Sequence, residues 1–185
     1  MTRWIALLRA VNVGGTGKLP MAELKAMAEA LGFAQVRTYI ASGNLLFESH
    51  LSEAAIKAAL ESRLAQYAGK PVGVLVRTVA EMAAVAAANP FADAPGNRVV
   101  AIFLDAPPGA ETLAQVRHQK DERLALGARE IYVHYGAGMA DSKLVIPAAK
   151  SGTARNLNSV ARLAAMAAEP GWSRAGPDQL PAPLA

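Results

Sequence analysis

The first 78 residues alternate between strand-like and helix-like apolar spacing, and the order of these segments restricts the fold more than any other feature of the sequence. Apolar residues of a strand alternate or form a short run, whereas those of an amphipathic helix recur every three or four positions. By this criterion we expect a strand over 3–11, a helix over 21–31, strands over 36–40 and 44–47, a helix between Ser52 and Gly69, and a strand over 72–76. The resulting β-α-β-β-α-β order predicts a ferredoxin-like sandwich.

Residues at the ends of these segments have the chemistry that caps and turns require. Pro20 suits the first turn of the first helix, and Gly32 ends its helical pattern. Ser52 can cap the second helix, and Gly69 ends it. Between the two middle strands, Gly43 supplies the positive φ of a tight connection, so these strands are expected to form a hairpin.

The rest of the chain predicts a connection and a second, less regular lobe. Alanine-rich residues 79–88 favour a connecting helix, and Pro, Gly and Asn residues up to 97 mark a break. Beyond the break we expect strands over 98–104, 121–126 and 130–135, and helices over 111–119, 139–145 and 154–168, the last capped by Thr153. This order repeats only part of the first lobe.

We therefore expect an α+β chain of two ferredoxin-like lobes in tandem, the second incomplete or modified. The boundaries are 1–78 for the N-terminal ferredoxin-like lobe, 79–97 for the connecting helix and loop, 98–169 for the C-terminal α+β lobe and 170–185 for a loosely packed tail. The tail is assigned because its Pro, Gly and polar residues show no periodicity.

Composition excludes several classes of function. The 185 residues contain no cysteine, which rules out disulfides, thiolate zinc sites and cysteine nucleophiles. No apolar run reaches the roughly 20 residues of a membrane-spanning helix, and we expect a cytoplasmic chain with no membrane partner. The net charge of +4 comes from dispersed Lys and Arg residues without a run of three, which favours a solvated basic surface over a nucleic-acid interface.

A glycine-rich loop connects the first predicted strand to the first helix. Gly14, Gly15 and Lys18 stand where backbone N–H groups and an ammonium could hold an anion. A nucleotide P-loop is excluded, because that pattern requires Gly in place of Asn12 and Ser or Thr in place of Leu19. Two interpretations stay open: an anion-binding loop, or glycines that merely permit an irregular connection.

Polar side chains lie at the predicted ends of apolar strands in both lobes. Arg9 follows such a strand, where an unpaired guanidinium would be costly, so it must have a partner. If these ends converge, one site for a phosphate or carboxylate would contain Arg9, Asn12, Gly14, Gly15, Lys18, Ser42, Gly43, Asn44, Thr153, Arg155 and Asn156. The structural alternative is that Arg9 braces the C-terminal helix, the asparagines stabilise turns, and Thr153 with Asn156 closes a helix N-terminus.

Catalytic and metal-binding patterns are missing from the sequence. His50, His118 and His134 are scattered and have no carboxylate at a metal-ligand spacing, so we expect no metal. Ser42 lacks the Gly-x-Ser-x-Gly elbow of a hydrolase. No pattern indicates a cofactor.

Five separated motifs occur in order along the chain. They are Leu-Leu-Arg-Ala-Val-Asn-Val-Gly-Gly at 7–15, Met-Ala-Glu-Leu at 21–24, Thr-Tyr-Ile-Ala-Ser-Gly-Asn at 38–44, Ser-Lys-Leu at 142–144 and Thr-Ala-Arg-Asn at 153–156. In these motifs the chain resembles the bacterial family catalogued as domain of unknown function 1697. The resemblance implies two ferredoxin-like lobes and no established activity. Leu157 departs from the family pattern, which usually has Trp there.

These observations lead to one expected function and two alternatives. We expect a binding or regulatory protein that takes a small anionic ligand in a cleft between the lobes, using residues 12–18 with Arg9 and Arg155. The first alternative is an enzyme acting on a phosphorylated substrate, in which Lys18 or the arginines stabilise developing charge. The second is a nucleic-acid-binding module that uses the open face of a ferredoxin-like sheet. The oligomeric state stays open.

Overall fold

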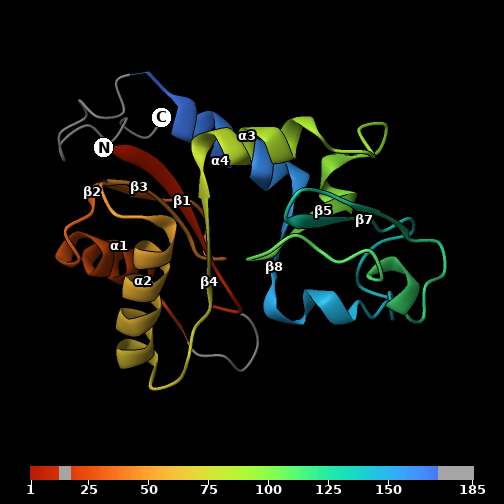
Figure 1. Ribbon diagram of the computed structural model, residues 1–185, viewed down its shortest axis with the longest axis horizontal. Helices are drawn as coiled ribbons and strands as arrows, with labels where there is room; N and C mark the ends of the chain where they lie inside the picture. Colours follow the sequence, from red (N-terminus) through yellow and green to blue (C-terminus); the bar gives the residue numbers. More distant parts are fainter. Residues whose placement is uncertain (13–17, 171–185) are drawn as a thin grey trace, which may run out of the picture.

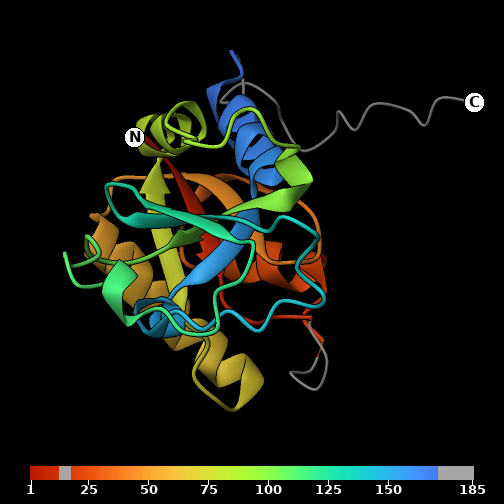
Figure 2. The same cartoon turned by 90° about the vertical axis from the view of Figure 1, so that its right-hand side faces the viewer.

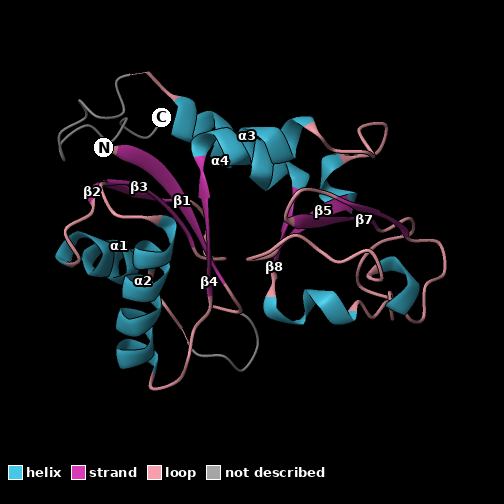
Figure 3. Cartoon of the chain, viewed as in Figure 1, coloured by secondary structure: helices cyan, strands magenta, loops and turns pink. Residues whose placement is uncertain are grey.

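Two four-stranded antiparallel sheets form the framework of the protein, whose computed structural model describes residues 1–12 and 18–170 (Figure 1). The first sheet has the order β2-β3-β1-β4, with β1 (Thr2–Leu8), β2 (Ala34–Thr38), β3 (Asn44–Ser49) and β4 (Val74–Thr78). The second has the order β6-β7-β5-β8, with β5 (Val99–Phe103), β6 (Arg123–Leu126), β7 (Glu130–His134) and β8 (Thr153–Asn156). The α-helices are α1 (Met21–Ala30), α2 (Glu53–Ala68), α3 (Val79–Ala87) and α4 (Leu157–Ala168) (Figure 3). The predicted α+β class is therefore confirmed.

Strand β1 is buried on both faces, which explains its unbroken apolar sequence. Trp4, Ala6 and Leu8 belong to the core that the first sheet forms with α1 and α2. Ile5 and Leu7 point to the opposite face and belong to a second core, which the first sheet shares with the second. The first sheet thus separates two apolar layers.

Helices α1 and α2 cover the outer face of the first sheet (Figure 1). Ser52 caps α2, since its Oγ accepts a hydrogen bond from Ala55 N, and Gly69 ends the helix with a φ of 69°. Both ends of α2 lie where the sequence predicts them. The apolar stripe that α2 buries is Ile56, Leu60 and Leu64.

Helices α3 and α4 pack against each other and lie along one edge of the pair of sheets in both views (Figures 1 and 2). The shared core contains Leu46 and Leu75 of the first sheet, Phe103 of the second, Val85 of α3 and Leu163 of α4. Residues of both predicted lobes therefore pack in one core. The predicted domain boundaries stay predictions.

Loops rather than α-helices cover the outer face of the second sheet. The side chains that pack there are Leu144, Ile146, Ala148 and Ala149. The helices predicted over 111–119 and 139–145 are wrong, and only short 3-10 turns occur nearby, η2 (Leu113–Gln115) and η3 (Pro147–Ser151). Arg117 and Val145 exchange two backbone hydrogen bonds of 2.9 Å, which hold both segments in an extended conformation.

The segment predicted as the start of the last helix is a strand. Thr153 does not cap a helix: Thr153–Asn156 forms β8, which pairs antiparallel with β5. Because the backbone groups of β8 bond across the sheet, they are not available to a helical ladder. Asn156 is the actual cap of α4, and its Oδ1 accepts a hydrogen bond from Ser159 N at 2.9 Å.

Two further predictions concern membrane-spanning helices and the C-terminal tail. Among residues 1–12 and 18–170, no helix has the length and apolarity that crossing a membrane requires. Of the loosely packed tail predicted over 170–185, all but Pro170 lies outside the described residues.

Candidate functional site

Arg155 joins the two sheets from its position in β8, where it is 7% exposed. Its Nε donates to Asn44 Oδ1 in β3 of the first sheet at 2.8 Å. Its Nη1 donates to Thr153 Oγ1 and to the Ala154 carbonyl, both at 2.9 Å. Its Nη2 contacts three carbonyl oxygens at the adjoining end of the first sheet, those of Leu8, Ser42 and Gly43.

These acceptors of the Arg155 guanidinium are all neutral protein oxygens. Burial lowers the pKa of Arg155 to about 10, which still leaves the side chain charged at neutral pH. Because each of the three guanidinium nitrogens is hydrogen-bonded to protein, Arg155 acts here as a brace between the sheets. Its donors are thus taken up by acceptors of the protein itself.

The loop that leads into β3 is held by its own side chains. Asn44 is fully buried, and its Nδ2 donates to the Tyr39 carbonyl at 2.7 Å and to Ser42 Oγ at 3.0 Å. Gly43 has a φ of 88°, and a Cβ at this position would lie 2.7 Å from Val11 Cγ2. Only glycine satisfies both constraints. Ser42, Gly43 and Asn44 therefore meet Arg155 through contacts that hold the fold together.

Arg9 has the partner that its position demands. Its Nε donates to the Gly152 carbonyl at 2.9 Å, and its Nη2 donates to the Lys150 carbonyl. Both acceptors precede β8, so Arg9 braces the turn before that strand and not the C-terminal helix. The aliphatic part of Arg9 passes close to Gly73, where a Cβ would lie 2.8 Å from Arg9 Cδ.

Asn12 ties together the two described ends of the glycine-rich connection. Its Nδ2 donates to the Leu19 and Ala41 carbonyls, both at 2.8 Å, and its Oδ1 accepts a hydrogen bond from Leu19 N at 2.7 Å. Asn12 has a φ of 54°, a left-handed conformation that asparagine adopts more readily than most residues. Gly14 and Gly15 lie outside the described residues.

Some of the predicted site residues thus surround Arg155, and the others lie at separate positions in the fold. Arg155 gathers Ser42, Gly43, Asn44 and Thr153 around the end of β1. Asn12 belongs to the loop after β1, Lys18 is exposed at the start of the next described segment, and Asn156 caps α4.

Two further ion-pair sites lie outside the predicted site residues: one lies between the two sheets, and the other connects the residue before β7 with helices α2 and α3. Arg77 of β4 and Glu130 of β7, 1% and 3% exposed, pair at 3.1 Å. Arg129 pairs with Glu53 and with Glu81, each at 2.9 Å. A signal for Arg77 exists in the sequence, because a charge within an apolar strand requires a buried partner.

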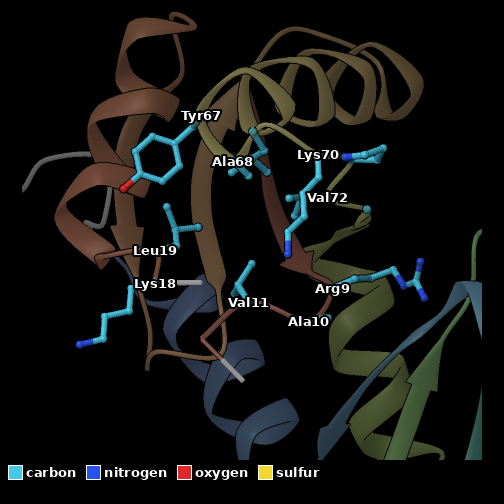
Figure 4. Close-up of a pocket in the computed structure, with 12 residues that line it drawn as sticks. Arg9, Ala10, Val11, Lys18, Leu19, Tyr67, Ala68, Lys70 and Val72 are labelled. Carbon is cyan, nitrogen blue, oxygen red and sulfur yellow. The ribbon is translucent and has the colours of Figure 1, made fainter. Parts of the chain in front are cut away.

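A pocket of about 470 Å³ lies at the end of the first sheet, where β1 stops and β4 starts. The loop after β1 forms one part of its lining, and the last turns of α2 with the residues leading into β4 form the other. Its apolar lining includes Val11, Leu19, Leu64 and Val72, with Tyr67 beside them (Figure 4). All the described residues that line it precede residue 78, so this part of the pocket belongs to the predicted N-terminal lobe.

Three cationic residues and no carboxylate belong to the described lining of the pocket. Lys18 and Lys70 are exposed, and Arg9 is half-buried. Figure 4 shows Lys70 extending toward the loop that carries Ala10 and Val11, whereas the guanidinium of Arg9 points away from Tyr67 and Lys18. In residues 1–12 and 18–170, no group of three or more His, Asp or Glu side chains could hold a metal ion. Exposed ammonium groups beside an apolar wall are chemistry that suits an anion.

Fold and site together define an α+β protein of two antiparallel sheets that carries a cation-lined pocket at one end of its first sheet. A family model described as a protein of unknown function, DUF1697, matches residues 1–132, and the chain belongs to this family. The matched region includes the whole pocket and ends before Arg155.

The chain also has a solved structural neighbour. A conserved bacterial protein from Streptococcus pneumoniae is 25% identical, with a TM-score of 0.73 over 90% of this chain and 98% of that chain. No curated protein matches this sequence. The neighbour is described only as a conserved bacterial protein, and this description names no ligand or activity.

Proposed function

We propose that this protein binds a small anionic ligand in the pocket at the end of its first sheet. The observation that carries the proposal is the composition of the lining, which combines Arg9, Lys18 and Lys70 with an apolar wall and contains no carboxylate among the described residues. A volume of about 470 Å³ lies within the range of small-molecule sites. The sequence predicts a ligand-binding cleft between the lobes, whereas we place the ligand in the pocket at the end of the first sheet.

The charges of the pocket support binding of an anion. Lys18 and Lys70 take part in no ion pair with the residues that the structure describes, in contrast to Lys57, which pairs with Glu61 and Asp105. An exposed ammonium without a carboxylate partner keeps its full charge for a ligand. Arg9 adds a third positive charge at the edge of the pocket, while its carbonyl partners leave that charge uncompensated.

Thermal unfolding in the presence of inorganic phosphate tests this proposal. A ligand that binds only the folded chain raises its stability by about 1.4 kcal/mol at ten times the dissociation constant. We expect phosphate to raise the melting temperature of the wild type more than sodium chloride of equal ionic strength does. Lys70→Ala should reduce this rise, whereas Lys120→Ala, which removes an exposed lysine outside the pocket lining, should retain it. Equal rises in both variants would contradict the proposal.

We also propose that both sheets belong to ferredoxin-like lobes in tandem. Across each sheet, the strands follow one another as the second, third, first and fourth strand of that half of the chain, and all pairings are antiparallel. In the second half, η2 and η3 stand where the first half has α1 and α2. This correspondence supports a modified second lobe. We further propose that the protein is bacterial and cytoplasmic.

A further inference from the structure

We infer that the segment after α4 folds back onto the protein and that the indole ring of Trp172 occupies a second pocket, beside the end of that helix. Trp172 itself lies outside the described residues. Four features carry the inference: the apolar lining of the pocket, the position at which α4 ends, the turn signal that follows α4, and a cation in the lining. The second pocket shares no described lining residue with the proposed anion site.

The second pocket has a volume of about 430 Å³ and lies where α3 begins and α4 ends, beside the start of β1 (Figure 1). Its apolar lining residues are Met1, Val79, Ala80, Ala167 and Ala168. The alanines have short side chains, which leave room for a larger group between the two helices. The volume lies within the range of pockets that hold a small organic group. An aromatic ring is therefore a suitable occupant.

The end of α4 is fixed beside this pocket. Arg3 Nη1 donates to the carbonyls of Ala167 and Glu169, both at 3.1 Å. The carboxylate of Glu169 pairs with Arg37 of β2 at 3.1 Å. Because these contacts join the end of α4 to the first sheet, the residues that follow start from a defined position next to the pocket.

The residues after α4 carry a signal for chain reversal. Glu169 has a ψ of 128°, which ends the helix, and it precedes Pro170 and Gly171. Pro followed by Gly favours the two central positions of a type II turn, whose outer residues lie within about 7 Å of each other. Such a turn would place Trp172 near Glu169, which follows the pocket-lining Ala168. Trp172 is therefore within reach of the pocket.

Two interactions favour the indole ring in the pocket over the same ring in water. Contact with the apolar lining removes the surface of the ring from water. The guanidinium of Arg3 also belongs to the lining, and tryptophan is the aromatic side chain that attracts cations most strongly. Together these interactions predict that the docked form exceeds the undocked form at least about tenfold.

Tryptophan fluorescence of the full chain tests this inference, because the sequence contains only two tryptophans, Trp4 and Trp172. The difference between the wild type and Trp172→Phe gives the signal of Trp172. We expect this signal at a shorter wavelength than in the urea-unfolded chain, with acrylamide quenching that is several-fold weaker. Emission and quenching equal to those of the unfolded chain would overturn the inference.

A matched pair of substitutions on α3 tests whether Trp172 lies in this pocket. Ala80→Glu adds a long, charged side chain to the lining, in the first turn of α3, where the helix dipole tolerates a carboxylate. It should displace the ring and raise the quenching of Trp172 several-fold. Ala83→Glu adds the same side chain at an exposed position outside the described lining and should leave the quenching unchanged. Equal quenching in the two variants would overturn the assignment to this pocket.

Nuclear Overhauser effects supply a second measurement, made on the chain without substitutions. We expect contacts between the indole protons of Trp172 and the methyl groups of Ala80 and Ala168 within one molecule. Contacts that occur only between differently labelled copies in a mixture would show that the segment docks on a second copy, and they would overturn the inference. Absence of both kinds of contact would overturn it as well.

Discussion

Arg155 Nε donates to Asn44 Oδ1 at 2.8 Å, and this bond joins strand β8 of the second sheet to strand β3 of the first. Both residues are buried, and within residues 1–12 and 18–170 neither has a carboxylate among its hydrogen-bond partners. Arg155 therefore joins the two sheets through neutral oxygens, whereas Arg77, a second buried arginine between the sheets, pairs with the carboxylate of Glu130.

Arg155→Ala should lower the free energy of unfolding by about 3 kcal/mol, because several buried acceptors lose their donor together. Arg162→Ala removes an arginine from the exposed face of α4 and should change stability by less than about 0.5 kcal/mol. Urea denaturation of both variants gives the comparison. Equal stability of the two variants would show that Arg155 does not brace the two sheets. A double-mutant cycle with Asn44→Ala should show non-additive losses.

Gly43→Ala should destabilise the protein more than Gly32→Ala does. The two glycines have nearly the same φ, 88° and 87°, so the backbone cost of a side chain is similar at both. At Gly43 the added Cβ would also lie 2.7 Å from Val11 Cγ2, whereas nothing lies within 4 Å at Gly32. We expect a loss of about 1 kcal/mol at Gly32 and at least about 2 kcal/mol at Gly43. Denaturant unfolding measures the difference, and equal losses would show that the close contact is unimportant.

Acid should weaken the protein partly through Glu53. A side-chain hydrogen bond from Arg129 holds the pKa of Glu53 below its ordinary value of 4.5. A carboxyl whose pKa is lower in the folded state contributes stability above its unfolded pKa, and this contribution is lost as the pH falls through the folded value. Glu53→Gln should therefore reduce the dependence of unfolding free energy on pH below about 4.5.

The matched control for this prediction is Glu23→Gln. Glu23 is exposed in the first turn of α1 and stands in no ion pair with a described residue. Its variant removes one carboxyl but leaves the Glu53–Arg129 pair in place. Denaturation of all three proteins between about pH 3 and 7 makes the comparison. If Glu53→Gln loses stability toward acid as steeply as the wild type does, the Glu53–Arg129 pair does not contribute to the pH dependence of unfolding.

Elements with strong local signals were predictable from the sequence. Helix α2 is the clearest case, since Ser52, Gly69 and the buried stripe specify both its ends and its face. Strand β8 lacks such signals, because it has only four residues and depends on pairing with β5, about 50 positions earlier. Thr153 at its start resembles a helix cap in the sequence, but Asn156 takes that role.

The sequence predicts the pocket residues that directly follow β1. It does not predict those that come from the distant segment 64–73. Arg9 and Lys18 belong to a conspicuous strand-loop-helix connection. Tyr67 and Lys70 belong to no recognisable sequence motif. They line the same pocket because the C-terminal end of α2 lies near the end of β1. Arg155 lies in β8 and not in the helix predicted over 154–168, and its burial and its partners depend on how the two sheets pack.

The most direct test of the central claim is an NMR titration of ¹⁵N-labelled protein with inorganic phosphate. The amide signals of Ala10, Val11, Lys70 and Gly73 should shift in a saturable manner, because these residues line the proposed anion site. The amide of Lys120, outside the lining, should not shift. Saturable shifts confined to other parts of the molecule, or shifts absent throughout the pocket, would contradict the assignment of this pocket to an anionic ligand.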